Sequence, residues 1–161
     1  MRPDPQQGLM PSLLDRLIDP EATGTSLRQG YSIDQMSRAV LRDLDELLNT
    51  RLTTLDIPTD CQETLASIAA FGMPDLSSVP AATPLQRAAI GKTLETIIMR
   101  FEPRLRDVRA TLVDNDAEKT RSVRFLLAGR LCIDPSPEIA FDTVLELTTG
   151  HSTVSPLDKT P

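Results

Sequence analysis

The chain has 161 residues, of which 40% are hydrophobic and 25% charged, so its length and composition predict one compact globular domain. Its 17 basic and 23 acidic residues give a formal net charge of -6, which argues against a nucleic-acid partner. Aromatic residues make up only 3% of the chain, which leaves few platforms for bases or sugars. No apolar run approaches the roughly 20 residues that span a bilayer, and the start lacks the features of a signal peptide. We therefore expect a cytoplasmic protein without direct membrane insertion.

The first residues, 1–11, contain three prolines, two glutamines and a glycine, a composition that predicts a disordered N-terminal tail. Ser12 and Asp15 then form a plausible helix start, followed by apolar residues at helical spacing: Leu13, Leu14, Leu17 and Ile18. A helix this short is not stable alone, so we expect its apolar side to dock on the rest of the domain.

Two further helix starts follow. Ser32 and Gln35 match a capping box before a long amphipathic helix, whose apolar positions include Ile33, Met36, Val40, Leu44 and Leu47. Asp60 and Glu63 resemble a second capping box, which predicts a shorter helix that runs to about Ala70.

A third major helix is predicted to begin after Thr83, with Pro84 at its first position and Gln86 three residues after the cap. Its helical pattern continues until Pro103. Gly91 lies inside this pattern and costs about 1 kcal/mol relative to alanine, which a close packing contact would explain.

The hydrophobic period then changes to two, with one strand around Val108–Leu112, a second around Val123–Leu127 and a third over Ile139–Leu147. Residues 114–116 and 134–137 supply turns. The polar segment 151–161 is expected to fray, and we assign residues 155–161 to a disordered C-terminal tail. Helices first and strands second predict an α+β fold, with N-terminal helices packed on a small, largely antiparallel C-terminal β-sheet.

Few residues suggest catalysis. His151 is the only histidine, and Cys61 and Cys132 lie far apart without a metal-binding motif, so both cysteines are expected to be small apolar side chains. Glycine-rich phosphate loops are absent from the sequence. Glu102 with a second acid is a weak glycosidase candidate, since aromatic sugar platforms are scarce. We expect no catalytic residue, no metal and no cofactor.

Two clusters at helix ends stand out, Leu47–Arg51 and Phe101–Leu105. In the second cluster Pro103 stiffens the chain, so that Glu102 and Arg104 project from a rigid corner. One interpretation is that Arg104 binds a carboxylate of a partner. The other is that Glu102 and Arg104 pair with charges of their own domain, Arg51 included.

These clusters, together with three other segments in the same order, resemble the TssE family of type VI secretion baseplate subunits, which is related to the wedge proteins of contractile phage tails. The segments are Leu13–Leu17, Arg42–Leu44, Leu47–Arg51, Ser67–Leu76 and Phe101–Leu105. The resemblance spans about Ser12 to Val154 and implies a single baseplate wedge-like domain over residues 12–154. Ala70 departs from the pattern, because relatives often carry a polar side chain there.

The resemblance implies a structural component without a substrate, docked at the inner membrane within the assembled machine. It would join a wedge core of TssF and TssG to the contractile sheath of TssB and TssC. An outer strand near Thr143–Thr149 would add to the strands of the sheath. The residues implicated in partner binding are the corner and its neighbours: Glu102, Pro103, Arg104, Asn49, Thr50 and Arg51.

Two alternative functions belong to other classes. Some relatives carry a lysozyme-like name, which would make this chain a peptidoglycan hydrolase acting through an acid such as Glu102. A related fold also occurs in an antiadaptor that sequesters a regulator. The lack of an aromatic cleft disfavours the hydrolase, and the two helix-end clusters favour the baseplate over the antiadaptor.

Overall fold

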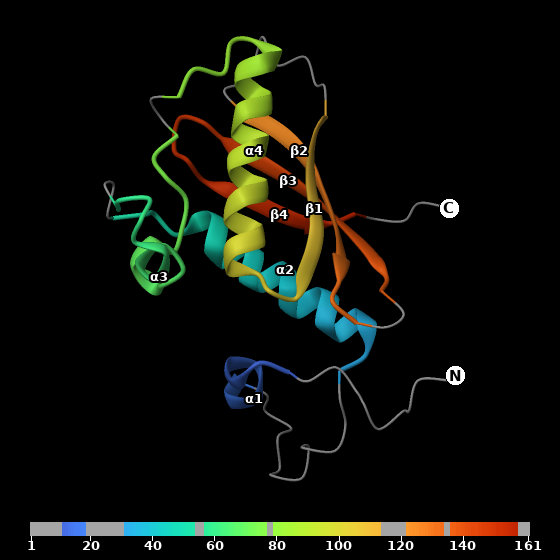
Figure 1. Cartoon of the computed structure of the whole chain (residues 1–161). Helices are drawn as coiled ribbons and strands as arrows, with labels where there is room; N and C mark the ends of the chain where they lie inside the picture. Colours follow the sequence, from blue (N-terminus) through green and yellow to red (C-terminus); the bar gives the residue numbers. More distant parts are fainter. Residues whose placement is uncertain are drawn as a thin grey trace.

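The computed structural model describes residues 11–18, 31–53, 57–76, 79–113, 122–133 and 136–157. Figure 1 shows the elements in chain order, and the helices come before the strands. The elements are α1 (Leu13–Ile18), α2 (Ile33–Asn49), α3 (Gln62–Leu65), η2 (Ile68–Ala70), α4 (Pro84–Phe101), β1 (Leu105–Val113), β2 (Ser122–Leu131), β3 (Glu138–Glu146) and β4 (Ser152–Pro156).

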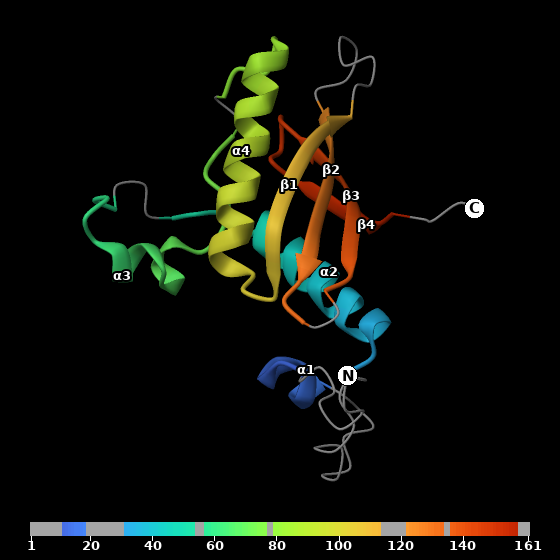
Figure 2. The ribbon, with the colours of Figure 1, turned by 45° about the vertical axis from the view of Figure 1, so that its right-hand side comes forward.

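The four strands form one antiparallel sheet in the order β1-β2-β3-β4, so each strand pairs with its neighbour in sequence (Figure 2). The predicted α+β fold with a C-terminal antiparallel sheet is therefore confirmed. Alternate residues of β2 are buried, as the period-two pattern predicts, and Phe125 is fully buried at the centre. The remaining strand residues point to the opposite face.

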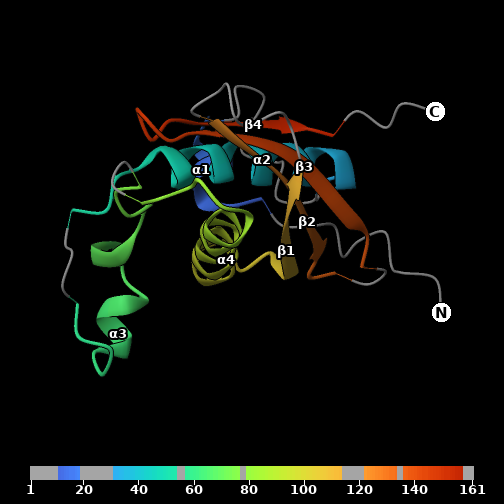
Figure 3. The same ribbon diagram turned by 90° about the horizontal axis from the view of Figure 1, so that it is seen from above.

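Both long helices cover the same face of the sheet, as the view from above shows (Figure 3). α4 lies along β1, whereas α2 lies against β4, so the helical layer reaches from one edge strand to the other. The core between the layers is almost entirely aliphatic and includes Val40, Leu44, Leu48, Ile90, Leu94, Ile98, Val108, Phe125, Leu131 and Leu145.

The starts of α2 and α4 confirm two predictions. The Ser32 hydroxyl accepts the N–H of Gln35, while the Gln35 side chain accepts the N–H of Ser32 at 2.8 Å. Thr83 and Gln86 form the same reciprocal box before α4. Each box satisfies backbone donors that a helix start leaves free.

Gly91 allows α4 to approach the sheet closely. A Cβ atom at this position would lie 3.1 Å from the Phe125 ring and 3.4 Å from the carbonyl oxygen of Ala110. The helix cost of this glycine is therefore offset by contact with β1 and β2.

The helix predicted from Asp60 and Glu63 is wrong in detail, because the structure divides it into α3 and η2. Cys61 takes the N-cap position of α3 and provides no side-chain bond. Ser67 donates to the Thr64 carbonyl at 2.8 Å and accepts the N–H of Ala69 at 3.2 Å. These local bonds replace the backbone bonds that would continue the helix.

The C-terminal segment also differs from the prediction. Residues 152–156, expected to fray or to begin a tail, form β4 and pair with β3. Thr143 belongs to β3, an inner strand, and is fully buried, so the polar outer edge predicted near Thr143–Thr149 does not exist. Residues 1–10, 114–116 and 158–161, parts of the predicted tails and turn, lie outside the described residues.

The predicted start of α1 is confirmed, but its docking is not what the apolar pattern predicts. Ser12 and Asp15 bond reciprocally at the start of the helix. The apolar side chains remain open to solvent, with exposed fractions of 70% for Leu13, 48% for Leu14, 75% for Leu17 and 55% for Ile18. The buried residue of this helix is instead Asp15.

Candidate protein-binding site

The corner, residues Glu102–Arg104, connects α4 to β1 and is fixed by backbone hydrogen bonds on both sides. Glu102 ends α4, and its N–H donates to the Ile98 carbonyl at 2.8 Å. The N–H of Leu105 donates to the Glu102 carbonyl at 3.1 Å, and the Arg104 carbonyl accepts the N–H of Cys132 at 2.8 Å. Pro103 is exposed between these anchors. The corner is therefore a rigid turn with one proline at its surface.

The side chains of the corner are engaged within the domain. Arg104 Nε donates to Glu102 Oε1 at 2.7 Å, and Nη2 contacts both Glu102 Oε2 and Asp43 Oδ2. Glu102 is only 3% exposed. Burial by itself lowers the pKa of Arg104, but the hydrogen bonds and charges of Glu102 and Asp43 outweigh it and raise this pKa above its ordinary value. Arg104 therefore joins the corner to α2.

This ion-pair network continues to α1. Asp43 Oδ1 accepts from Arg42 Nη2 at 2.6 Å, and Arg42 Nη2 lies 2.7 Å from Asp15 Oδ1. Burial raises the pKa of Asp15, but its bonds to Ser12 and Arg42 outweigh this effect, so the pKa lies below its ordinary value. The charges alternate in sign along the whole network, which runs Asp15, Arg42, Asp43, Arg104, Glu102.

The network supports the interpretation in which Glu102 and Arg104 pair within their own domain, with one correction. Arg51, which that interpretation includes, takes no part: it contacts Asp75 at 3.4 Å and the carbonyl oxygen of Thr149. Asp43 on α2 provides the partner instead. Sequence reasoning missed this role of Asp43, although its position within the Arg42–Leu44 segment of the family pattern was a signal.

A groove remains open beside the network. This corner groove has a volume of about 400 Å³, and its lining includes Leu14, Glu46, Leu47, Phe71, Phe101, Pro103 and Arg104. Phe71 and Phe101 pack edge to face with ring centroids 5.3 Å apart. Arg104 Nη1 is buried and has no hydrogen-bond partner among the described residues. An apolar groove with one unpaired guanidinium nitrogen suits an apolar segment that brings a carbonyl or carboxylate oxygen.

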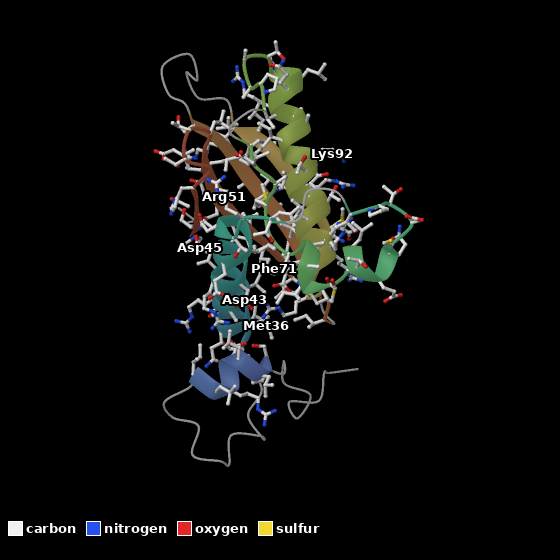
Figure 4. All side chains as sticks on the ribbon, turned by 90° about the vertical axis from the view of Figure 1, so that its left-hand side faces the viewer. Met36, Asp43, Asp45, Arg51, Phe71 and Lys92 are labelled. Carbon is white, nitrogen blue, oxygen red and sulfur yellow. The ribbon has the colours of Figure 1, made fainter. Side chains whose placement is uncertain are left out.

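The α2 end, residues Asn49–Arg51, lies elsewhere. Asp43 and Asn49 are six residues apart on one helix, roughly 9 Å along its axis. Figure 4 shows Arg51 at one end of α2 and Asp43 farther along the helix. The structure therefore does not place the α2 end and the corner in one cluster.

Each residue of the α2 end has an internal partner. Asn49 Oδ1 accepts the N–H of Ser152, and Asn49 Nδ2 donates to the Ser152 carbonyl, both at 2.9 Å. Thr50 Oγ1 donates to the Glu46 carbonyl at 2.7 Å. Arg51 joins the turn before β4 through the Thr149 carbonyl. The α2 end therefore holds the last strand of the sheet.

Gly72 fixes a second connection at the α2 end. The Met73 N–H donates to the Thr50 carbonyl at 2.8 Å, and Leu52 donates back to Met73 at 2.9 Å. Gly72 has φ +112°, and a Cβ atom here would lie 2.6 Å from the Thr50 oxygen. Ala70, the departure from the family pattern, is buried, so this chain has an apolar contact there.

The residues considered for catalysis do not assemble a reactive site. His151, Cys61 and Cys132 are exposed, so the prediction of two buried, core-like cysteines is wrong. Both lie at element ends, where little of the core reaches them. Both carboxylate oxygens of Glu102 accept hydrogen bonds from Arg104 within the domain. Among the described residues, no three His, Cys, Asp or Glu side chains cluster to hold a metal ion.

Residues 34–136 match the family described as "Baseplate wedge protein gp25". The chain belongs to this gp25 family. The matched region covers more than half of the chain and contains both the α2 end and the corner.

A chain in the solved structure "The baseplate complex from the type VI secretion system" aligns with a TM-score of 0.49 and 16% sequence identity, over 69% of this chain and 94% of that one. No curated protein matches the sequence. Within the described residues, no helix has the length and apolar character that crossing a membrane requires.

Proposed function

We propose that this gp25-family chain is the TssE-type wedge subunit of a type VI secretion baseplate. In this proposal it acts in the bacterial cytoplasm, at the inner membrane within the assembled machine. It joins a TssF–TssG wedge core to the TssB–TssC sheath and catalyses no reaction. Membership of the gp25 family supports the baseplate role, and the resemblance of its helix-end clusters to TssE supports the secretion machine.

The observation that carries the wedge contact is the corner groove. Its lining combines the apolar side chains of Phe71 and Phe101 with Arg104, whose Nη1 has no hydrogen-bond partner among the described residues. A partner segment from TssF or TssG would place an apolar side chain against the Phe71–Phe101 pair and a polar oxygen beside the Arg104 guanidinium. Glu102 and Asp43 position the guanidinium, because they hold its other nitrogens. Buried arginines of this kind often contribute much of an interface's binding energy.

The second contact in the proposal is strand addition by the sheath. Since Thr143 lies on an inner strand, we move the predicted docking edge to β4, which is an edge strand. Val154 on β4 is half-buried and belongs to the outer strand of the sheet. The backbone groups of an edge strand are a template for an added strand.

Affinity purification with two matched arginine variants tests the wedge contact. Arg104→Lys keeps the charge that Glu102 requires but removes the planar fork and Nη1. Arg124→Lys is the control, because Arg124 is paired with Asp142 on the sheet, away from the corner groove. We expect Arg104→Lys to reduce recovery of TssF and TssG at least about tenfold, with unchanged circular dichroism, while Arg124→Lys recovers both. Equal recovery with the two folded variants would contradict the proposal.

A further inference from the structure

The two edge strands of the sheet are both contacted by polar side chains from the helical layer. On β1, the Ala110 N–H donates to Glu95 Oε1 of α4 at 3.0 Å, and Glu95 is 6% exposed. The bond from Lys92 is the main cause that lowers the pKa of Glu95, so the carboxylate remains ionised and accepts this bond. Gly91 lies against the Ala110 carbonyl. α4 therefore covers the middle of the β1 edge.

On β4, Asn49 imitates the backbone of a neighbouring strand. Its side-chain amide carries one acceptor and one donor, which bond to the N–H and the carbonyl of Ser152 at 2.9 Å each. A residue of a paired strand makes the same two bonds in an antiparallel ladder. Ser152 is fully buried. The first residue of the β4 edge is therefore already paired.

The rest of the β4 edge is open. Backbone groups in a strand alternate sides, so Val154 and Pro156 direct theirs to the same side as Ser152. The pairing of Glu146 with His151 and of Ala140 with Leu157 on the other side agrees with this alternation. Among the described residues, no hydrogen bond reaches the outward groups of Val154. Pro156 offers only its carbonyl there.

We propose that Asn49 is an edge guard that prevents β4 from pairing with β4 of a second copy of this chain. A two-fold pairing centred on Val154 would use the N–H and carbonyl of Val154 in each copy. It would also join the Ser152 N–H of each copy to the Pro156 carbonyl of the other. Asn49 occupies the Ser152 N–H and so removes half of these bonds. This inference concerns self-association at the β4 edge that the proposed function assigns to the sheath, and its test on the isolated chain contains no sheath protein, so the two proposals can fail separately.

In the isolated chain, the lack of charge on the β4 edge allows a second copy of the same strand to pair with it. β4 has the sequence Ser-Thr-Val-Ser-Pro, with no charged residue to repel an identical strand. Edge strands in many proteins are protected by lysines, bulges or covering elements. β4 has a proline only at its last position. Among the described residues, Asn49 is therefore the main group that blocks pairing of the β4 edge with another strand.

Replacement of Asn49 by leucine tests the edge guard in the full chain. Leucine keeps the size of asparagine but can neither accept from nor donate to Ser152. We expect Asn49→Leu to raise the self-association constant at least tenfold in sedimentation equilibrium, and to speed amide exchange of Ser152 in the monomer. Thr50→Val is the matched control, because Thr50 bonds only within α2 through its side chain.

A second substitution identifies the surface. Val154→Pro removes an outward N–H without loss of a bond to β3, so Asn49→Leu combined with Val154→Pro is expected to be monomeric. A monomeric Asn49→Leu variant, or a dimer that persists with Val154→Pro, would overturn the proposal. If Asn49→Leu does not fold, Asn49→Ser decides: increased self-association supports the edge guard, and a monomer refutes it.

Discussion

The corner and the α2 end each contain an arginine and both bond within the domain, yet they differ in the hydrogen-bonding groups that they leave without a partner. At the α2 end, the Asn49 amide bonds to Ser152 and to the Asp45 carbonyl, so its donors and acceptor are occupied. At the corner, Arg104 Nη1 remains unpaired. The comparison teaches that two clusters at helix ends can differ in the hydrogen-bond capacity that they leave for a partner.

The substitution that we expect to destabilise the domain most is Arg104→Glu at the corner. This change removes the cation between Glu102 and Asp43 and adds a third carboxylate. We expect the free energy of unfolding to fall by about 3–5 kcal/mol. Urea denaturation followed by circular dichroism measures it. A loss below about 1 kcal/mol would show that the network does not stabilise the domain.

Gly72→Ala breaks the α2 end without touching the corner. Alanine is strained at φ +112°, and its Cβ would collide with the Thr50 carbonyl. We expect the free energy of unfolding to fall by about 2–3 kcal/mol, measured by urea denaturation. Ala70→Gly, in the same segment, is the control for added backbone flexibility. We expect it to lower the free energy of unfolding by about 1 kcal/mol. Equal losses for both variants would contradict a special role for the backbone at residue 72.

Asp15→Asn separates α1 from the network. The neutral side chain loses its ion pair with Arg42, and the apolar residues of α1 are too exposed to replace it. We expect faster amide exchange over α1 and a loss of about 1–2 kcal/mol at most, since Arg42 is partly exposed. Leu17→Ser should change stability by less than about 0.5 kcal/mol. If Leu17→Ser lowered the free energy of unfolding more than Asp15→Asn, the apolar residues rather than Asp15 would attach α1 to the domain.

The smallest expected effect is on the response of stability to acid, through Asp15 of the ion-pair network and Glu95 of α4. The pKa values of Asp15 and Glu95 are lowered in the fold, so their stabilisation is complete above the unfolded values of 3.8 and 4.5 and is lost as the pH falls through the lower folded values. We expect Glu95→Gln to reduce the loss of unfolding free energy that acid causes below about pH 4.5 by roughly 1 kcal/mol or less. Thr50→Val should leave this pH dependence unchanged.

The sequence predicts elements best where local chemistry determines them. Ser32 and Thr83 start their helices with complete capping boxes, and β2 follows a clear alternation. β4 was missed because its short polar sequence carries no such pattern. Its order comes from β3 and from Asn49, which is 103 residues away in the chain. Such a contact leaves no local signal.

The candidate site was predicted in part for a similar reason. The rigid corner at Pro103 follows from the sequence, but the partner of Arg104 does not, because Asp43 lies 61 residues away. The apolar pattern of α1 predicts burial, whereas the structure buries Asp15 and leaves Leu13 exposed. Periodicity identifies an apolar face but does not say what covers it.

The contact between α2 and β4 has a consequence for synthesis on the ribosome. The strands form a meander in which each strand can pair as soon as its successor emerges. α2 emerges early, yet β4, the strand it lies against, is near the end of the chain. A nascent chain therefore carries the apolar side of α2 without part of its cover until almost all residues are made. We expect chain release, rather than the appearance of α2, to set the moment at which the domain closes.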